Sequence, residues 1–306
     1  MKHIGILFAL TLLCIGCNRP SDEEMRAAIK GDWIVEQIKI PPKPNPSGKK
    51  LIKLDMGEVL LSFSFEDTLC SYFDDFTRFA RYSLHNDTLF IQERISQHPQ
   101  HEKSEKKIFR FLIEKLTDKE LILTPLDKEM KDICEDNKID TARIKLKKVT
   151  VKNRLTFDVL NFSTGGCYGT CPVMSLEIDS SGNFLFCGIE HVDTVGLFRG
   201  KLSTSDLASI RQKINALELD SLREKYQAPW TCDQTRNIII KSGCKSYSIS
   251  AYGFRSGPRE LRLLFHKLME VYRNVHLTQD STIAGQFKFN VFIPEDMLPK
   301  DEDSDR

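Results

Sequence analysis

Apolar residues recur at every second position in short runs between Trp33 and about Val149, and polar turn residues separate the runs. In one run, Phe109, Phe111 and Ile113 alternate with the residues between them. A period of two is that of a β-strand with one buried face. The pattern predicts eight short strands, at Trp33–Ile40, Val59–Phe65, Thr68–Phe73, Arg78–Leu84, Thr88–Gln92, Phe109–Ile113, Glu120–Thr124 and Ala142–Lys148.

Short turns between these runs favour an antiparallel meander, which tends to close into a barrel because closure removes its edges. Gly31-Asp32-Trp33, at the first strand, is the G-x-W pattern and resembles that of lipocalin-like barrels. The resemblance implies that Trp33 plugs one end of the barrel and that Arg143, near the last strand, covers it. It also implies room for a small apolar ligand, although an eight-stranded barrel can equally be filled by its own side chains.

Residues 155–276 have a different pattern, in which strand-like runs alternate with two helical ones. One helix is expected to start at Ser203, which can cap it, and the other has Pro258 at its first turn. This mixture predicts an α+β domain, an antiparallel sheet with both helices on one face. Its strands are expected at Leu155–Phe162, Val173–Ile178, Phe184–Ile189, Asn237–Lys241 and Tyr247–Ala251.

A glycine- and cysteine-rich block, GGCYGTCPVMS, precedes the second of these strands. It resembles an uncharacterised envelope domain family that has a GGCxGxCPxY-like block and no established activity. Its glycines let the backbone bring Cys167 and Cys171 together, and a disulfide is expected in an oxidising compartment. The spacing C-x-x-x-C-P also occurs in envelope copper chaperones, so a thiol-based copper or redox site at these two cysteines is the alternative.

The N-terminus, MKHIGILFALTLLCIGC, has a basic residue followed by an apolar stretch from Ile4 to Ile15. Twelve residues are too few to span a bilayer core of about 30 Å, so a cleaved export signal is predicted. Its end, Cys14-Ile15-Gly16-Cys17, resembles a bacterial lipobox, which implies lipidation at Cys17. An ordinary secretory signal with a chance cysteine is the alternative. Beyond it, Ser21 and Glu24 form a capping box for a short helix from about Asp22 to Lys30.

The C-terminal region combines an alternating run with an acidic end. Phe287–Ile293 alternates like a strand, and we expect it to pair with an edge of the second domain or to contact a partner. The end of the chain, from Pro294, is acidic and is expected to be disordered. The chain of 306 residues is therefore divided into an export signal (1–16), a tether and short helix (17–30), a barrel (31–150), an α+β domain (155–276) and a C-terminal strand and tail (277–306).

Charge and cysteine counts change once the signal is removed. Lys+Arg 44 and Asp+Glu 43 become 43 and 43 without Lys2, which excludes the strongly basic overall charge expected of a nucleic-acid binder. The nine cysteines become seven for thiol chemistry without Cys14 and Cys17. Nucleophile-elbow, P-loop, zincin and Rossmann motifs are absent from the sequence, and no cofactor is expected.

These features predict a non-enzymatic, lipid-anchored envelope protein of a Gram-negative bacterium, held on the membrane, the outer membrane being favoured, through acylated Cys17. Its expected partner is a small apolar ligand or another envelope protein. The alternative is a copper-binding or redox protein that uses Cys167 and Cys171.

Overall fold

A computed structural model describes residues 20–36, 62–67, 69–72, 78–93, 107–136 and 143–298. The predicted export signal, Cys17, the proline-rich stretch 41–50 and the acidic end from residue 299 lie outside the described residues. Within the described ranges, no helix is long and apolar enough to cross a membrane.

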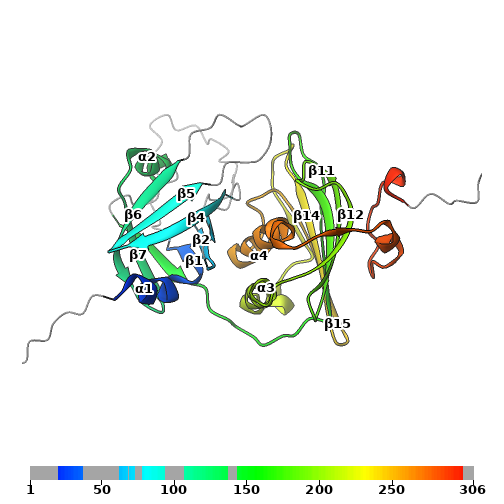
Figure 1. The fold of residues 1–306 in the computed structure, drawn as a ribbon, viewed down its shortest axis with the longest axis horizontal. Helices are drawn as coiled ribbons and strands as arrows, with labels where there is room; N and C mark the ends of the chain where they lie inside the picture. The colour runs from blue at the N-terminus through cyan, green and yellow to red at the C-terminus, as the bar shows by residue number, and fades with distance from the viewer. Residues whose placement is uncertain are drawn as a thin grey trace, which may run out of the picture.

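The N-terminal half forms a closed barrel, as the alternating pattern predicts (Figure 1). Each strand pairs antiparallel with the next, and the first pairs with the last, where Trp33 lies opposite Lys148. The eight strands are β1 (Gly31–Val35), β2 (Ser62–Phe65), β3 (Leu69–Tyr72), β4 (Arg78–His85), β5 (Thr88–Glu93), β6 (Ile108–Leu116), β7 (Glu120–Pro125) and β8 (Ile144–Lys148).

Large aromatic side chains occupy the interior of the barrel. Phe63 stacks on Phe65, with ring centroids 5.4 Å apart, and meets Phe111 edge to face at 5.9 Å. Trp33 and Phe109 belong to the same buried cluster. The inward positions of the described strands are thus filled by the protein's own side chains, which supply a packed core.

Two short helices lie against this barrel. The first, α1 (Asp22–Ile29), precedes β1, and its N-terminus carries the predicted capping box between Ser21 and Glu24. The second, α2 (Lys128–Asp136), follows β7 and was not predicted from the sequence. It buries Met130 and Cys134 in the barrel cluster. Although α2 is mostly polar, it therefore contacts the barrel through a narrow apolar face.

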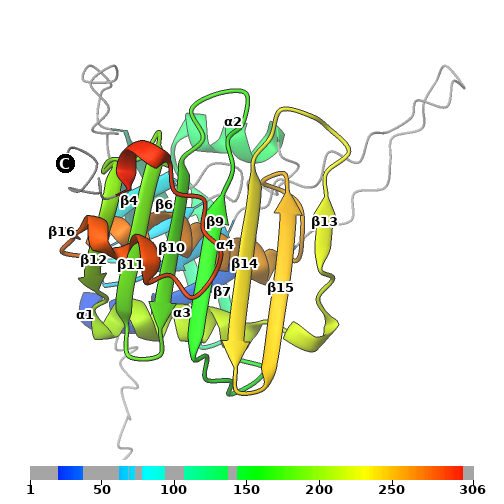
Figure 2. The ribbon, with the colours of Figure 1, turned by 90° about the vertical axis from the view of Figure 1, so that its right-hand side faces the viewer.

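The second half contains another eight-stranded sheet, with strand order β13-β15-β14-β9-β10-β11-β12-β16 (Figure 2). All its neighbours pair antiparallel except β13 and β15, which are parallel. The strands are β9 (Val159–Thr164), β10 (Val173–Asp179), β11 (Asn183–Glu190), β12 (Gly196–Lys201), β13 (Lys225–Gln227), β14 (Thr235–Ser242), β15 (Lys245–Tyr252) and β16 (Thr278–Gln279).

Two helices cover one face of this sheet and lie between it and the barrel (Figure 1). α3 (Thr204–Ala216) is capped by Ser203, and α4 (Arg259–Glu270) has Pro258 at its N-cap, so both predicted helices are confirmed. Short 3₁₀ turns follow them at Leu219–Ser221 and Val271–Asn274. The order of layers is therefore barrel, helices and sheet, with the C-terminal segment on the far side.

Sequence reasoning misplaced three parts of this second half. The first strand begins at Val159 rather than Leu155, and β12, β13 and β16 were missed. The expected strand at 287–293 is wrong, because that segment has no strand and packs on a face of the sheet instead of pairing at its edge. The edge next to β12 is already taken by β16, through Phe198–Gln279 and Arg199–Thr278 pairing.

Candidate functional site

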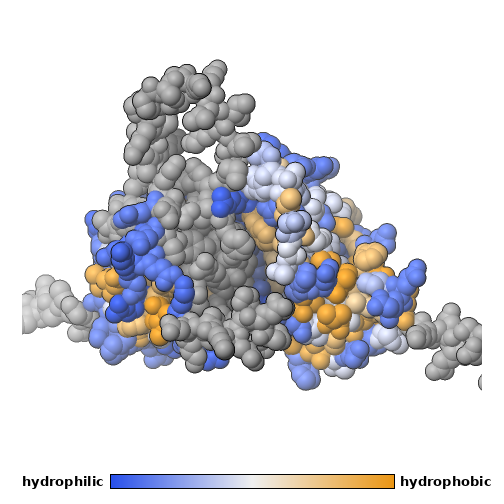
Figure 3. Space-filling model, turned by 90° about the horizontal axis from the view of Figure 1, so that it is seen from above, coloured by the Kyte–Doolittle hydropathy of each residue, from blue (hydrophilic) through white to orange (hydrophobic). Residues whose placement is uncertain are grey.

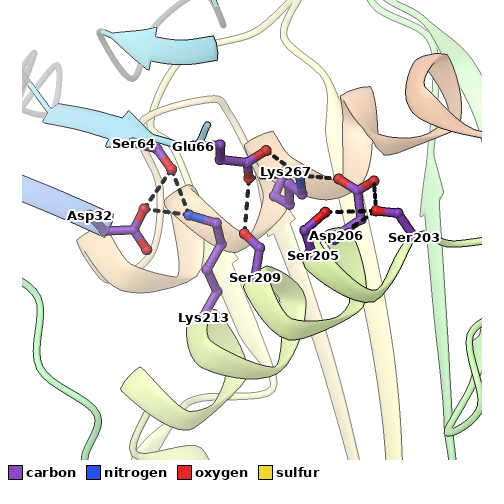
Figure 4. Close-up of polar contacts among 9 residues, drawn as sticks. All are labelled: Asp32, Ser64, Glu66, Ser203, Ser205, Asp206, Ser209, Lys213 and Lys267. Atoms are coloured by element: carbon purple, nitrogen blue, oxygen red, sulfur yellow. Dashed lines mark hydrogen bonds and ion pairs between the residues drawn. The ribbon is translucent and has the colours of Figure 1, made fainter. Parts of the chain in front are cut away.

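The strongest concentration of buried charge lies where barrel strands β1 and β2 meet helices α3 and α4. Side chains from four separate elements converge there, as Figure 4 shows. Burial of this many ionisable groups costs free energy unless each is paired. The interface between the barrel and the two helices is therefore the candidate site.

The first pair joins Asp32 on β1 to Lys213 on α3. The Lys213 side chain is 3% exposed and that of Asp32 6%, and the ammonium bonds directly to the carboxylate. Lys213 Nζ also donates to Ser64 Oγ at 2.8 Å, and Ser64 Oγ donates to Asp32 Oδ1 at 2.6 Å. The three groups form a closed triangle, so the buried lysine and the buried aspartate each have charged and hydroxyl partners.

The second cluster is centred on Lys267 of α4. Its ammonium donates to Glu66, just after β2, at 2.7 and 2.9 Å, and to Asp206 of α3 at 2.7 Å. Ser209 Oγ donates to Glu66 Oε1 at 3.0 Å, and Ser203 Oγ donates to Asp206 Oδ2 at 2.6 Å. One lysine thus ties the barrel to both helices.

The pKa values of this cluster shift in the directions that pairing predicts. Burial alone would raise the pKa of Asp206, but Lys267 and the Ser203 hydroxyl outweigh it and hold that pKa below its usual value. Burial opposes the charge of Lys267, yet Glu66 and Asp206 raise the pKa of its ammonium above the usual value. Asp206 and Lys267 are therefore both ionised at neutral pH.

The spacing along α3 explains how one short helix serves two neighbours. Asp206, Ser209 and Lys213 are separated by three and four residues, so they share a face that meets the barrel and α4. Leu207, Ile210 and Ile214, one position further on in each case, join the apolar cluster under the sheet. The polar face of α3 is hence a second buried face.

Gly31 brings the barrel close to α3. Its φ is +108°, in the region that favours glycine, and an added Cβ would lie 3.2 Å from Lys148 and 3.8 Å from Gln212 of α3. Nearby, Arg259 Nη1 at the start of α4 donates to Val35 O at 3.1 Å. Strand β1 is thus positioned by contacts with both helices.

A small cavity of about 40 Å³ borders the Lys213 and Lys267 clusters. Its walls come from β2, β3, α3, α4 and the 3₁₀ turn after α4, and they combine polar side chains with apolar ones. A space of this size holds a few water molecules. The polar walls include Ser64, Glu66, Ser71, Lys213, Lys267 and Asn274.

The cysteine block forms the loop between β9 and β10, and the predicted disulfide between Cys167 and Cys171 is confirmed. Gln234, which is fully buried, donates from Nε2 to Gly165 O at 2.8 Å and to Pro172 O at 2.7 Å. The loop is thus closed by a covalent bond and pinned at both ends. Tyr168, between the cysteines, is 90% exposed at its tip.

A second loop beside it is organised by Asp233. The sequence did not predict that the Asp233 carboxylate accepts several hydrogen bonds from this region. Its carboxylate accepts from Trp230 Nε1 at 2.9 Å and from the backbone N–H groups of Gln234 and Phe254 at 2.7 and 3.1 Å. Asp233 therefore joins the loop before β14 to the loop after β15, which is a structural task.

Residues 158–272 match a domain of unknown function, DUF6438. The DUF6438 domain runs from the start of β9 to the 3₁₀ turn after α4, so it contains the disulfide loop, α3 and α4. No curated protein matches the chain. The expectation of an uncharacterised domain with this cysteine block agrees with the match.

The barrel and the C-terminal segment lie outside the matched residues. Of the charged groups at the interface, Lys213, Asp206 and Lys267 belong to the DUF6438 domain, whereas Asp32 and Glu66 come from the barrel. The interface therefore joins the DUF6438 domain to a different structural module of the same chain.

Arg143 does not cover Trp33, since it is exposed and pairs with Glu114 at 2.9 Å. Lys148 lies over the Trp33 ring instead, 4.9 Å from its centroid, and Trp33 Nε1 donates to Ile29 O at 2.6 Å. Strand β8 places Lys148 directly opposite Trp33, whereas Arg143 precedes that strand.

The copper or redox alternative rests on Cys167 and Cys171, both of which are used by the disulfide. Pro172 is followed by strand β10. Among the described residues, no group of three or more His, Cys, Asp or Glu side chains is arranged to hold a metal ion.

Proposed function

We propose that this chain is a lipid-anchored, non-enzymatic interaction protein of the Gram-negative cell envelope. The lipobox-like end of the N-terminal signal, at Cys17, is the observation that carries the proposal. A disulfide on an exposed loop supports it, because such bonds persist in oxidising compartments such as the periplasm. Acyl chains on Cys17 contribute about 0.8 kcal/mol per buried CH₂, enough for stable attachment with several chains.

The anchor also gives the molecule an orientation. Cys17 and Asp22, the first residue of α1, are five positions apart, which limits the connection to about 18 Å. The end of the barrel that bears α1 would then face the membrane. The disulfide loop between β9 and β10 lies at the opposite end of the molecule from α1 (Figure 2), so it would point away from the membrane.

This orientation favours contact with another envelope protein as the role of the exposed end. Tyr168 at the loop tip is a large side chain held out by a closed loop, and such preordered aromatic residues lose little entropy on binding. The barrel interior is filled by aromatic side chains. This filling favours a structural role for the lipocalin-like barrel over the storage of an apolar ligand. A thermal-shift screen with fatty acids distinguishes the two roles, since a stabilising hit would favour storage.

Metabolic labelling with a fatty-acid probe tests the anchor. The wild-type protein is expected to incorporate the probe and to fractionate with membranes, and Cys17→Ala is expected to lose both properties. A matched control is Cys232→Ser, which alters an exposed cysteine far along the chain and should remain labelled. An unlabelled wild-type protein, or a labelled Cys17→Ala variant, would overturn the proposal.

A further inference from the structure

The face of the sheet opposite to α3 and α4 is crossed by the C-terminal segment, residues 281–298 (Figure 2). This segment, called the strap below, follows β16 and contains two short 3₁₀ turns, Ser281–Gly285 and Glu295–Met297, joined by irregular chain that bends at Lys288 and Phe289. It is not part of the sheet, and it lies outside the DUF6438 match.

The strap packs on an apolar patch of β11 and β12. Cys187 and Leu197 of the sheet and Ile283 of the strap are buried together. Further strap and sheet residues complete this cluster, namely Leu185, Ile189, Ala284, Phe287, Ile293 and Met297. Hydrophobic residues are also exposed on this side of the molecule (Figure 3). Phe292 of the strap is 74% exposed. The strap therefore covers apolar sheet surface that would otherwise face solvent.

A single buried carboxylate fixes the middle of the strap. Glu177 on β10 is 4% exposed, and its two oxygens accept the backbone N–H of Lys288 at 3.1 and 2.9 Å. The Lys241 ammonium on β14 lies over the Phe289 ring, 4.7 Å from its centroid. Burial raises the pKa of Glu177, and the Lys288 N–H and nearby Lys288 and Lys241 charges oppose the rise.

The strap lacks the backbone ladder that holds the strands. Within the continuous described stretch 143–298, no backbone–backbone hydrogen bond joins residues 287–298 to the sheet. What holds this part is side-chain packing and the Glu177 carboxylate. Segments with few buried contacts and no ladder open at a lower free energy than the core to which they are attached.

We propose that the outer sheet face under the strap, called the groove below, is a docking site for an apolar segment, which residues 281–298 of the same chain occupy reversibly. The recognition chemistry is visible in the strap itself: apolar side chains such as Ile283, Phe287 and Ile293 pack on β11 and β12, and a backbone N–H donates to Glu177. The groove would accept a partner segment of the same chemistry when the strap leaves.

Cys187 reports whether the groove is covered. It is fully buried beneath the strap, and burial raises the pKa of its thiol to about 11, so it should react slowly while the strap is docked. The chain supplies internal standards for alkylation, because Cys232 and Cys244 are exposed whereas Cys70 and Cys134 are buried in the barrel. Peptide mapping by mass spectrometry resolves each site in the full chain.

Glu177→Ala is the first test variant, and the exposed Glu224→Ala, next to the β13 edge, is its matched control. Alkylation at Cys187 is expected to accelerate about tenfold in Glu177→Ala, the scale of losing a hydrogen bond to a charged acceptor, with Cys70 and Cys134 unchanged. The Glu224→Ala protein should match the wild type. Equal Cys187 and Cys134 rates in every variant would overturn the proposal, because the strap would then open only with the whole fold.

A second experiment tests the groove as a binding site. In a chain ending at Asp280, Cys187 should approach the alkylation rate of Cys232, and a synthetic peptide of residues 281–298 should restore its protection. A scrambled peptide is the control. If the shortened chain does not fold, Phe289→Ala in the full chain should still accelerate Cys187 alkylation. If the shortened chain folds and the peptide does not protect Cys187, the groove is not a binding site for the strap. If the shortened chain does not fold, an unchanged Cys187 alkylation rate in Phe289→Ala would contradict the proposal.

Discussion

The ammonium of Lys213 on α3 bonds to the carboxylate of Asp32 on β1, with both side chains almost fully buried between the barrel and the DUF6438 domain. Removing one partner strands the other charge away from water. We expect Lys213→Met to lower the free energy of unfolding by about 3–5 kcal/mol, as for other broken buried pairs. Urea denaturation measures the change.

The double variant Asp32→Leu/Lys213→Met should recover at least half of that loss, since it leaves no buried charge unpaired. Lys245→Met is the matched control, because the Lys245–Asp220 pair is exposed, and it should show no measurable change. A Lys213→Met protein as stable as the wild type would show that the pair does not hold the interface.

Asp206 makes the interface sensitive to acid. Its folded-state pKa lies below the usual value, so its ionised form stabilises the fold at pH values above the unfolded pKa of about 3.9. This stability is lost as the pH falls through the lower, folded-state pKa. The raised pKa of Lys267 affects stability only at alkaline pH. Its contribution is present below the unfolded-state pKa of about 10.4 and is lost as the pH rises above that value through the folded-state pKa.

We therefore expect the stability of the wild type to fall more steeply below about pH 4 than that of Asp206→Asn, whose neutral amide cannot titrate. Thermal unfolding across pH 2–6, at about constant ionic strength, measures the two slopes. Asp132→Asn, an exposed substitution on α2, should keep the wild-type slope. Equal slopes of stability against pH at acidic pH for the wild type and Asp206→Asn would refute a role for this carboxylate.

The basic residue over Trp33 can be assigned by comparing two substitutions. Lys148→Met removes the cation over the ring and a hydrogen bond from Nζ to Ala28 O at 3.1 Å, and should cost about 1–2 kcal/mol. Arg143→Met breaks only a half-exposed pair with Glu114 and should cost less than about 1 kcal/mol. Unfolding followed by Trp33 fluorescence in a Trp230→Phe background measures both changes. The reverse ranking would favour Arg143 as the basic residue that covers Trp33.

The disulfide is expected to contribute modestly because it closes a short loop. For cysteines four positions apart, the chain-entropy model gives about 2 kcal/mol for Cys167→Ser/Cys171→Ser. Calorimetry of the oxidised wild type and the double variant measures it, with Cys232→Ser as a control that removes an exposed free thiol. A difference near zero would mean that the Gln234 hydrogen bonds alone hold the loop.

The sequence predicted the barrel because its inward residues alternate, but the same period was misleading on β2. Ser62 and Ser64 occupy positions that alternation assigns to a wet face, yet both are buried. A period of two identifies which residues share a face, and it carries no information about what covers the other face. The cover here is α3, which is more than a hundred residues away in the chain.

The interface charges could not be found from the sequence for the same reason. Lys213 and Lys267 lie on the polar sides of predicted amphipathic helices, where lysines normally face solvent. Residues 287–293 show the converse error. Their alternation is real, but with β16 already at the sheet edge they pack on the sheet face rather than extending the ladder.

The buried ion pairs are expected to make the barrel and the DUF6438 domain one cooperative unit. Hydrogen exchange with mass spectrometry across increasing urea tests it, by following peptides from β6 in the barrel and β14 in the second sheet. Both peptides should lose protection at the same urea concentration in the wild type and at separate concentrations in Lys213→Met/Lys267→Met. Separate transitions in the wild-type protein would contradict cooperative unfolding of the barrel and the DUF6438 domain.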